Sequence, residues 1–182
     1  MVQRVVSSPA DTDSSLTQSD KLAVGGIKLS NPLVLIRWET PDPEALESVL
    51  ERLASGQINL PVVLIDAAKN AACAMFCIDA SEIDRAQPIL QDVDGIRRIA
   101  PVVAISVYPF GRRLTLLGKI LQAFACRALP IYAAGSSLAS LVVLTDHDRR
   151  KECIESLLDH VRLPENHAPF EPEFQVRYQE RS

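Results

Sequence analysis

The apolar pattern of this chain repeats after 71 positions, because 117 − 46 and 124 − 53 give the same difference. Apolar residues of one predicted helix have counterparts in a second: Leu46 and Leu117, Val49 and Ile120, Leu50 and Leu121, and Leu53 and Phe124. The same offset joins residues of other predicted elements: Ile36 and Val107, Leu60 and Ile131, Ile83 and Ile154, and Leu90 and Val161. An offset shared by several elements indicates an internal duplication. We therefore expect two similar units in the 182 residues.

Each unit shows the same order of predicted elements. In the first, Asp42 and Pro43 precede a helix with apolar residues at helical spacing, and Ser81 is expected to begin a second helix that Pro88 shortens. The predicted strands of this unit are 33–38, 60–65, 72–78 and 96–99. The second unit repeats the order with strand 102–107, helix 114–128, hairpin 131–144 and helix 149–161. The pattern predicts the α+β class: two tandem ferredoxin-like (βαββαβ) modules with antiparallel sheets.

The predicted boundaries place the first module at 31–100 and the second at 101–168. Residues 1–22 are rich in polar residues, which is typical of a disordered tail. Residues 169–182 are expected to form a tail or an edge strand, because Phe174, Val176 and Tyr178 alternate with polar residues. Strand 102–107 is apolar on both faces, so we expect another sheet to cover its second face, within the chain or in a homodimer.

Charge and composition narrow the classes of function. The 19 basic and 23 acidic residues give a formal net charge of −4, and no basic block would attract nucleic acid. Apolar runs are far shorter than the roughly 20 residues that cross a bilayer, and the first residues lack the pattern of a secretory signal. We therefore expect a cytoplasmic protein without a nucleic acid or membrane partner. The four cysteines are expected to be reduced core residues.

Several short segments resemble the tandem ACT region of aspartokinases. They are 25–29 before the first module, 58–59 at its second strand, 103–107 and 135–137 in the second module, and 140–144 before its last helix. The resemblance covers about residues 23–165 and the regulatory part of that family alone. It implies a non-catalytic, allosteric regulatory unit that binds a free amino acid and acts as a homodimer or with a partner enzyme. It also implies that residues 23–30 form a strand that pairs with the second module.

In that family the ligand lies at the loop between the first strand and first helix of a module, where helix N-terminal N–H groups favour a carboxylate. The resemblance implies two candidate sites. The site in the second module comprises Arg112, Arg113, Leu114, Ile131, Tyr132 and Ser136. The matching set in the first module is Asp42, Glu44, Asn59 and Leu60. Both loops lack the Pro-Gly pair that is common in the family, and Glu44 brings a negative charge to the place that would receive an anion.

The sequence contains no pattern of catalytic or nucleotide-binding residues. Segment 24–26 lacks the spacing and the Lys-Ser/Thr of a phosphate-binding loop. Cys73 and Cys77 lie about 13 Å apart on a predicted strand, which excludes one tetrahedral metal site, and the three histidines lie in polar surroundings. We therefore expect no enzyme activity, metal or cofactor. Two alternatives to ligand sensing stay open: a degenerate ACT scaffold for protein association, and a regulatory subunit of an aspartokinase-like enzyme.

Overall fold

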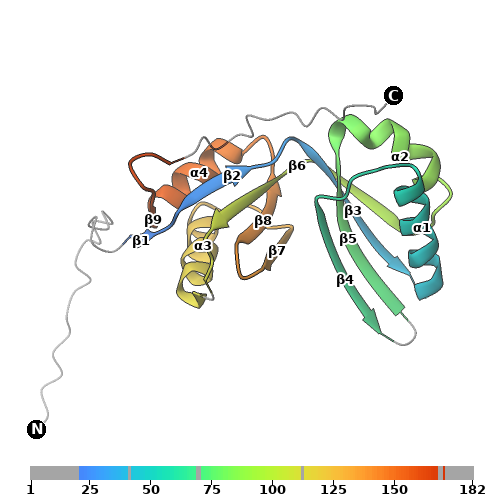
Figure 1. Cartoon of the computed structure of the whole chain (residues 1–182), viewed down its shortest axis with the longest axis horizontal. Coiled ribbons are helices and arrows are strands. Elements are labelled where there is room, and N and C mark those ends of the chain that lie inside the picture. Colours follow the sequence, from blue (N-terminus) through green and yellow to red (C-terminus); the bar gives the residue numbers. More distant parts are fainter. Residues whose placement is uncertain (1–20, 41, 69–70, 112, 168–169, 171–182) are drawn as a thin grey trace, which may run out of the picture.

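The computed structural model describes residues 21–40, 42–68, 71–111, 113–167 and 170. Figure 1 shows two halves that diverge from a long strand, β6 (Ile96–Tyr108). The first half contains β3 (Leu33–Thr40), α1 (Pro43–Ser55), β4 (Val62–Ala68), β5 (Ala71–Asp79), the 3-10 helix η2 (Ala80–Glu82) and α2 (Ile83–Leu90). The second half contains β1 (Leu22–Ala23), β2 (Gly26–Leu29), α3 (Leu114–Cys126), β7 (Ala133–Ser136), β8 (Leu141–Asp146), α4 (Arg150–Leu158) and β9 (Val161–Arg162). Of the predicted tails, 1–22 and 169–182, residues 1–20, 169 and 171–182 lie outside the described residues. The N-terminal tail was predicted too long, because Leu22 already belongs to β1.

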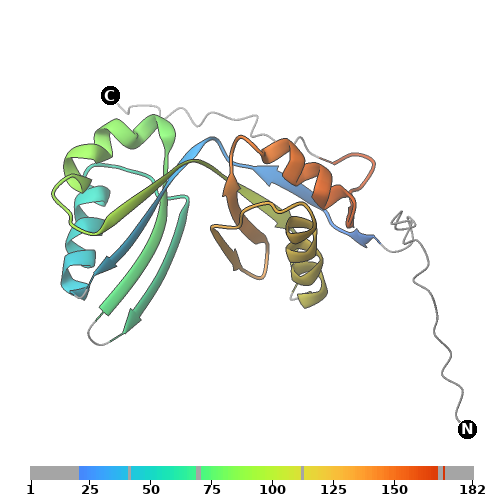
Figure 2. The same ribbon diagram turned by 180° about the vertical axis from the view of Figure 1, so that it is seen from behind.

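The first half is an antiparallel sheet with the strand order β6–β3–β5–β4. Helices α1 and α2 both cover its outer face, as Figures 1 and 2 show from opposite sides. The core between this sheet and its helices contains Ile36, Trp38, Leu53, Phe76 and Leu90. The predicted antiparallel sheet is therefore confirmed for this half.

The second half takes one strand from the N-terminal segment. Its sheet has the order β2–β6–β8–β7, and β2 runs antiparallel to the C-terminal part of β6, with Ile27 opposite Val107. Ile27 is fully buried, in the core that also holds Phe124 and Leu157. Beside this core, β1 pairs in parallel with β9. The segment before β3 thus belongs to the second half, although it precedes the first half in the sequence.

Strand β6 belongs to both halves. Its N-terminal part pairs with β3, whereas its C-terminal part lies between β2 and β8. The expected boundary between Ala100 and Pro101 therefore falls inside one continuous strand of 13 residues. The two halves are joined by sheet hydrogen bonds and not by a flexible linker.

The sheet faces that carry no helices pack against each other near β6. Leu35, Cys77, Val102 and Leu144 lie at the buried centre of this contact. Val103, the next residue along β6, lies instead in the core on the helix side of the second half. The prediction that another sheet covers the second face of 102–107 is confirmed, and the covering sheet belongs to the same chain.

The 71-residue repeat holds up to β7 and then changes. Helices α1 and α3 have 13 residues each, and their first residues, Pro43 and Leu114, are 71 positions apart. Strands β5 and β8 end at Asp79 and Asp146, which are only 67 positions apart. The hairpin of the second half is shorter, and the offset of 71 is not restored after it.

The predicted pairing of Ile83 with Ile154 and of Leu90 with Val161 is therefore wrong. With an offset of 67, Leu90 corresponds to Leu157, and both side chains are buried on the inner face of the last helix of their half. The carboxylates of the two strand-end aspartates confirm this alignment, because each accepts the N–H two residues further on.

Local capping agrees with the sequence at α1 and differs at α2. The Asp42 side chain accepts the Glu44 N–H at 2.9 Å and caps α1 as predicted. Ser81 is not the N-cap that the sequence suggested, because the Asp79 carboxylate accepts both its N–H and its hydroxyl and caps η2. The predicted strands 60–65 and 72–78 extend further towards each other, since β4 continues through Ala68 and β5 begins at Ala71.

The helical spacing of the repeated apolar residues predicts that Leu46, Leu50, Leu53, Leu117, Leu121 and Phe124 are buried, and for Leu121 this prediction is wrong. Leu121 is 43% exposed on the outer side of α3, whereas Leu116 and Ile120 are fully buried. With the offset of 71, the position in α1 that matches Leu116 is Ala45. Because leucine is larger than alanine, α3 turns Leu116 towards the core, and Leu121 lies on the outer side. Of the other predicted core residues, Leu46, Leu53 and Phe124 are buried and Leu50 and Leu117 are half-buried.

The cysteines are not all in the core. Cys77 and Cys153 are buried and Cys73 is half-buried, but Cys126 is exposed at the end of α3, contrary to the prediction. Burial raises the pKa of the Cys77 thiol to about 12, which makes that thiol unreactive.

In the described part of the chain no helix is long and apolar enough to cross a membrane. Within the same residues, no group of three His, Cys, Asp or Glu side chains is placed to hold a metal ion.

His160 lies in a buried position at the end of α4, and not in the polar surroundings that the sequence suggested. It is 8% exposed, and its Nδ1 has no hydrogen-bond partner in the part of the chain that the structure describes. Burial lowers the pKa of His160 below its ordinary value, and Lys119 and Lys21 add to this effect while Asp159 opposes it. The folded chain therefore favours the neutral imidazole.

We expect the stability of the folded chain to fall as the pH drops below about 6.5. The unfolded chain binds a proton at His160 near the ordinary pKa, whereas the folded pKa lies lower, so acid favours unfolding. Melting temperatures across this range should fall more steeply for the wild type than for His160→Gln. Equal slopes for the wild type and His160→Gln would exclude His160 as the cause.

Candidate functional site

The corner between β6 and α3 contains the helix start that the sequence singled out in the second half. The N–H of Phe110 donates to the Ala139 carbonyl at 3.1 Å, and the N–H of Gly111 donates to the Leu138 carbonyl at 3.2 Å. Gly111 has a φ of +57°, a left-handed conformation that favours glycine. The turn between β7 and β8 is thus bonded to the corner and uses two of its backbone donors.

Arg113 binds backbone carbonyls on both sides of this corner. Its Nη1 donates to Ala23 at 2.8 Å, its Nη2 to Pro109 at 2.6 Å and its Nε to Phe110 at 3.3 Å. The guanidinium group therefore ties the end of β1 to the start of α3. An arginine side chain has five N–H donors, and the described residues accept from three of them. Arg112 lies outside the described residues.

Replacing Arg113 with Ala should lower the free energy of unfolding by about 1.5–3 kcal/mol, since hydrogen bonds to a charged group are worth about that much. Urea unfolding measures this difference. Arg127→Ala is a matched control, because Arg127 forms surface ion pairs with Asp159 and Glu155 that are worth about 0–1 kcal/mol. An equal effect of the two substitutions would contradict the structural role of Arg113.

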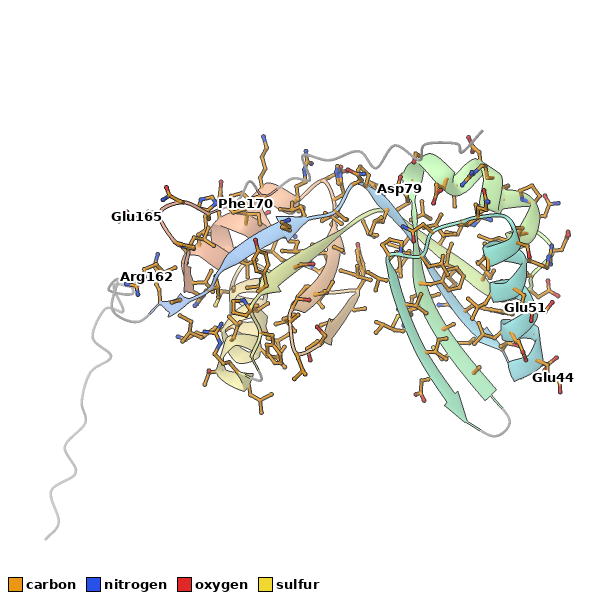
Figure 3. The ribbon with its side chains drawn as sticks, viewed as in Figure 1. Glu44, Glu51, Asp79, Arg162, Glu165 and Phe170 are labelled. Atoms are coloured by element: carbon orange, nitrogen blue, oxygen red, sulfur yellow. The ribbon has the colours of Figure 1, made fainter. Side chains whose placement is uncertain are left out.

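At the corresponding corner of the first half, before α1, side chains of the corner itself accept the backbone N–H groups. The Asp42 carboxylate accepts the Glu44 N–H, and the Thr40 hydroxyl accepts the Asp42 N–H at 3.1 Å. Figure 3 shows Glu44 and Glu51 projecting from α1 away from the sheet. A carboxylate of the chain itself thus stands where an anionic ligand would bind the start of α1.

The remaining predicted site residues lie at the other ends of the helices. Asn59 and Leu60 follow α1, and Ile131 and Tyr132 follow α3. A helix of 13 residues is about 20 Å long, so a single chain does not bring these residues to the helix starts. Asn59 is exposed and its N–H donates to Glu82 at 3.1 Å. The other three are half-buried and pack against the hydrophobic cores.

Leu114 and Ser136 lie at the same end of the second half as Arg113. Leu114 is 74% exposed at the first position of α3. Ser136 is exposed at the end of β7, next to the turn that is bonded to the corner. Of the predicted set, the structure therefore brings Arg113, Leu114 and Ser136 to one end of the molecule.

A cavity of about 230 Å³ lies between the edge strands β4 and β7. Its lining is apolar at Val62, Leu64, Val142 and Leu144 and carries hydroxyl groups at Ser136, Ser137 and Ser140. The Ser137 hydroxyl accepts the N–H groups of Ala139 and Ser140 at 3.1 Å, so the turn that closes the corner also forms part of this cavity. Ser136 is the predicted site residue that lines it.

Sequence reasoning missed the contribution of β4 to this cavity, because β4 belongs to the other half of the chain. The serines at 136, 137 and 140 were the signal for its polar side. A second cavity, of about 480 Å³, lies beside α1 and is lined by Trp38, Thr40 and Arg52 among others. None of the predicted site residues lines that second cavity.

Comparisons of the sequence give no relative, since no protein-family model matches the chain and no curated protein is significantly similar to it. Comparison of the structure does. The regulatory subunit of aspartate kinase from Thermus flavus superposes with a TM-score of 0.65 at 16% identity, over 76% of this chain and 98% of that one. This chain has the fold of an aspartate kinase regulatory subunit.

Two further solved structures show the same aspartate kinase regulatory fold. The ligand-free regulatory subunit from Thermus thermophilus has a TM-score of 0.63 at 15% identity, over 76% of this chain and 99% of that one. A structure of aspartokinase alpha and beta subunits has a TM-score of 0.64 at 18% identity, over 74% and 95% of the two chains. The resemblance read from the sequence is thereby confirmed at the level of the fold. In this regulatory fold, the chain carries two internally bonded helix starts and a small cavity between its edge strands.

Proposed function

We propose that this chain is a non-catalytic regulatory module of the ACT type, which senses a small ligand, an amino acid, and acts on a partner through its assembly. The proposal takes 31–100 and 101–168 as tandem ferredoxin-like modules, with residues 23–30 completing the second. The observation that carries it is the strand order, with two helices to each sheet: fourth–first–third–second in the first half, and the same arrangement in the second half with β2 in the position of the fourth strand. Agreement with solved regulatory subunits over nearly their whole length supports the same assignment.

The proposed assembly uses two of the free sheet edges. Within the described residues β4 and β7 each pair with one strand only, and Val63 and Ile65 of β4 are 42% and 48% exposed. Free edges with exposed apolar side chains favour pairing with another chain. Residues at the start and end of one helix, which lie about 20 Å apart in a single chain, can meet only across such an interface. We therefore propose a homodimer or a complex with an aspartokinase-like enzyme.

The ligand site that we favour is the corner of the second half. There the carboxylate of an amino acid would meet the first turn of α3 and the two remaining donors of Arg113. Its side chain would lie over Leu114 or reach towards Ser136 and the cavity between β4 and β7. A cavity of about 230 Å³ is below the usual range for drug-sized ligands, about 300–1,000 Å³, and suits a small molecule such as one amino acid.

A thermal-shift screen of the twenty amino acids, followed by calorimetry, tests the sensing role. A ligand present at a hundred times its Kd stabilises the folded chain by about 2.7 kcal/mol. Arg113→Ala should then weaken the affinity by about ten-fold or more, because it removes a charge-assisted contact. The Arg127→Ala control should bind as the wild type does. Absence of heat and of stabilisation with every amino acid at millimolar concentration would contradict sensing by this chain.

The second candidate is a degenerate ACT scaffold that mediates protein association without a ligand. Two observations favour it. The Asp42 carboxylate already caps α1, and the carbonyls of Leu138 and Ala139 already accept donors of the other corner. If the chain is such a scaffold, its assembly should form at the same protein concentration with and without amino acids.

A further inference from the structure

The cavity between β4 and β7 differs in chemistry from the corner beside it. The two strands lie on the facing sides of the two halves (Figures 1 and 2), and twelve residues line the cavity between them. Among these described residues none has a charged side chain, since eight are apolar, one is glycine and three are serines. The corner, in contrast, presents the guanidinium group of Arg113. Cavity and corner therefore suit different parts of one ligand.

The apolar walls of the cavity come from both halves. Val62 and Leu64 line it from β4, and Val142 and Leu144 line it from β8. A Cβ atom built on Gly135 of β7 would lie 3.5 Å from Cδ2 of Leu64, which is an ordinary contact distance. The side chain of Leu64 thus reaches across to β7 and bounds the space in which a ligand can lie.

The hydroxyl groups gather at one end of the cavity. All three serines lie at the end of β7 or in the turn that follows it. The Ser137 hydroxyl accepts the N–H groups of Ala139 and Ser140, which uses both of its lone pairs. Ser136 is exposed, so water competes for its hydroxyl. A ligand group that lies against β4 and β8 meets lining side chains that offer no hydrogen bond.

The size and polarity of the cavity limit the group that it accepts. An apolar cavity of about 150 Å³ holds a benzene molecule, so about 230 Å³ is enough for a branched aliphatic side chain. The charged end of a lysine or glutamate side chain would lose its water there without an opposite charge, which is strongly unfavourable. A hydroxyl group placed against the apolar walls would also lose hydrogen bonds to water.

A single residue connects the cavity to the corner. The carbonyl of Ala139 accepts the Phe110 N–H of the corner at 3.1 Å, and the N–H of Ala139 donates to the Ser137 hydroxyl at the cavity. The two places are therefore neighbours. A ligand of the size of one amino acid can contact both, with its carboxylate at the start of α3 and its side chain in the cavity.

We propose that the amino acid sensed by this chain has an uncharged, branched aliphatic side chain, as valine, isoleucine and leucine have, and that the cavity between β4 and β7 holds this side chain. Leu64 is then a residue that determines specificity. The inference rests on the proposed function, because it takes the corner with Arg113 as the place of the carboxylate. It deepens that function by naming the class of amino acid.

Calorimetry of the wild-type chain with valine and threonine tests the specificity, because the two side chains have the same shape and differ by a methyl group in place of a hydroxyl. Valine should bind about ten-fold more tightly or better, since a hydrophobic pocket rejects an added hydroxyl by up to about a hundred-fold. Lysine and glutamate should give no heat at concentrations at which valine saturates the chain.

The failure of this inference differs from the failure of the proposed function. Equal affinities for valine and threonine, or tighter binding of lysine or glutamate, would overturn the inference and leave the sensing role intact. Absence of binding by all twenty amino acids would contradict the sensing role, and the inference would fall with it.

Substitutions separate the cavity from the corner. Leu64→Ser replaces an apolar wall with a hydroxyl and should remove the preference for valine over threonine. Arg113→Ala should weaken both ligands equally and keep that preference, because both carry the same carboxylate. Leu121→Ser makes the same exchange at an exposed leucine outside the lining of the cavity and should bind as the wild type does. A preference that survives Leu64→Ser would overturn the assignment of the side chain to the cavity.

A milder variant keeps the test independent of the stability of Leu64→Ser. Gly135→Ala adds one methyl group to the cavity at an ordinary contact distance from Leu64. It should weaken the binding of leucine more than that of valine, because leucine has the larger side chain. Gly118→Ala is the matched control, since a Cβ atom at Gly118 meets nothing within 4 Å. Unchanged affinity for leucine in Gly135→Ala would also overturn the assignment.

Discussion

Replacing Ile27 with Ala is expected to lower the free energy of unfolding by about 2–5 kcal/mol, the usual cost of truncating a fully buried isoleucine. Ile27 lies on β2, opposite Val107 of β6, and is fully buried in the core of the second half. The loss of stability arises there because β2 supplies one strand of that sheet, although it precedes the whole first half in the sequence. Urea unfolding followed by circular dichroism measures the change.

Lys28→Ala is the matched control on the same strand. Lys28 is exposed and its neighbours along β2 are buried, so its truncation should change stability by no more than about 0.5 kcal/mol. If Ile27→Ala had an effect as small as that of Lys28→Ala, the N-terminal segment would not be part of the second core.

Replacing Phe124 with Ala is expected to cost about 3–5 kcal/mol, because the ring is 1% exposed in the core of the second half. Leu121 lies one turn away on the same helix, and its side chain is 43% exposed; its replacement with Ala is the comparison. It should cost only about 1–1.5 kcal/mol, since little more than half of that side chain is removed from water. Comparison of the two melting curves decides which face of α3 is buried. Equal losses would support the sequence pattern, in which both residues face inward, over the observed packing.

The 71-residue repeat predicted much of the fold because it follows the apolar residues with which the helices and strands of both halves face their cores. It located α1 and α3 with the correct offset, since both helices begin after a sheet strand and have the same length. It failed after the β7–β8 hairpin, whose shorter strands change the offset to 67. The paired aspartates at 79 and 146, which both accept an N–H two residues on, were the local signal of this change.

The candidate site was less predictable than the fold. Residues at the start and end of one helix were grouped because the family pattern draws on both, but the helix holds them about 20 Å apart. The contacts of Arg113 with Ala23, Pro109 and Phe110 were not foreseeable, because they depend on where the N-terminal segment lies. The cavity between β4 and β7 joins residues of both halves, and no spacing along the chain indicates that contact.

Hydrogen exchange of the wild-type chain, with and without each amino acid at millimolar concentration, tests the sensing role most directly. Binding at the favoured corner should slow exchange in peptides covering 109–117 and 133–142, because ligand contacts there suppress local opening. Peptides covering α1 should exchange at the same rate in both states. Protection confined to 109–117 and 133–142 with one amino acid is the predicted result. Unchanged exchange in both regions with all twenty amino acids would contradict the account and leave the chain as a scaffold.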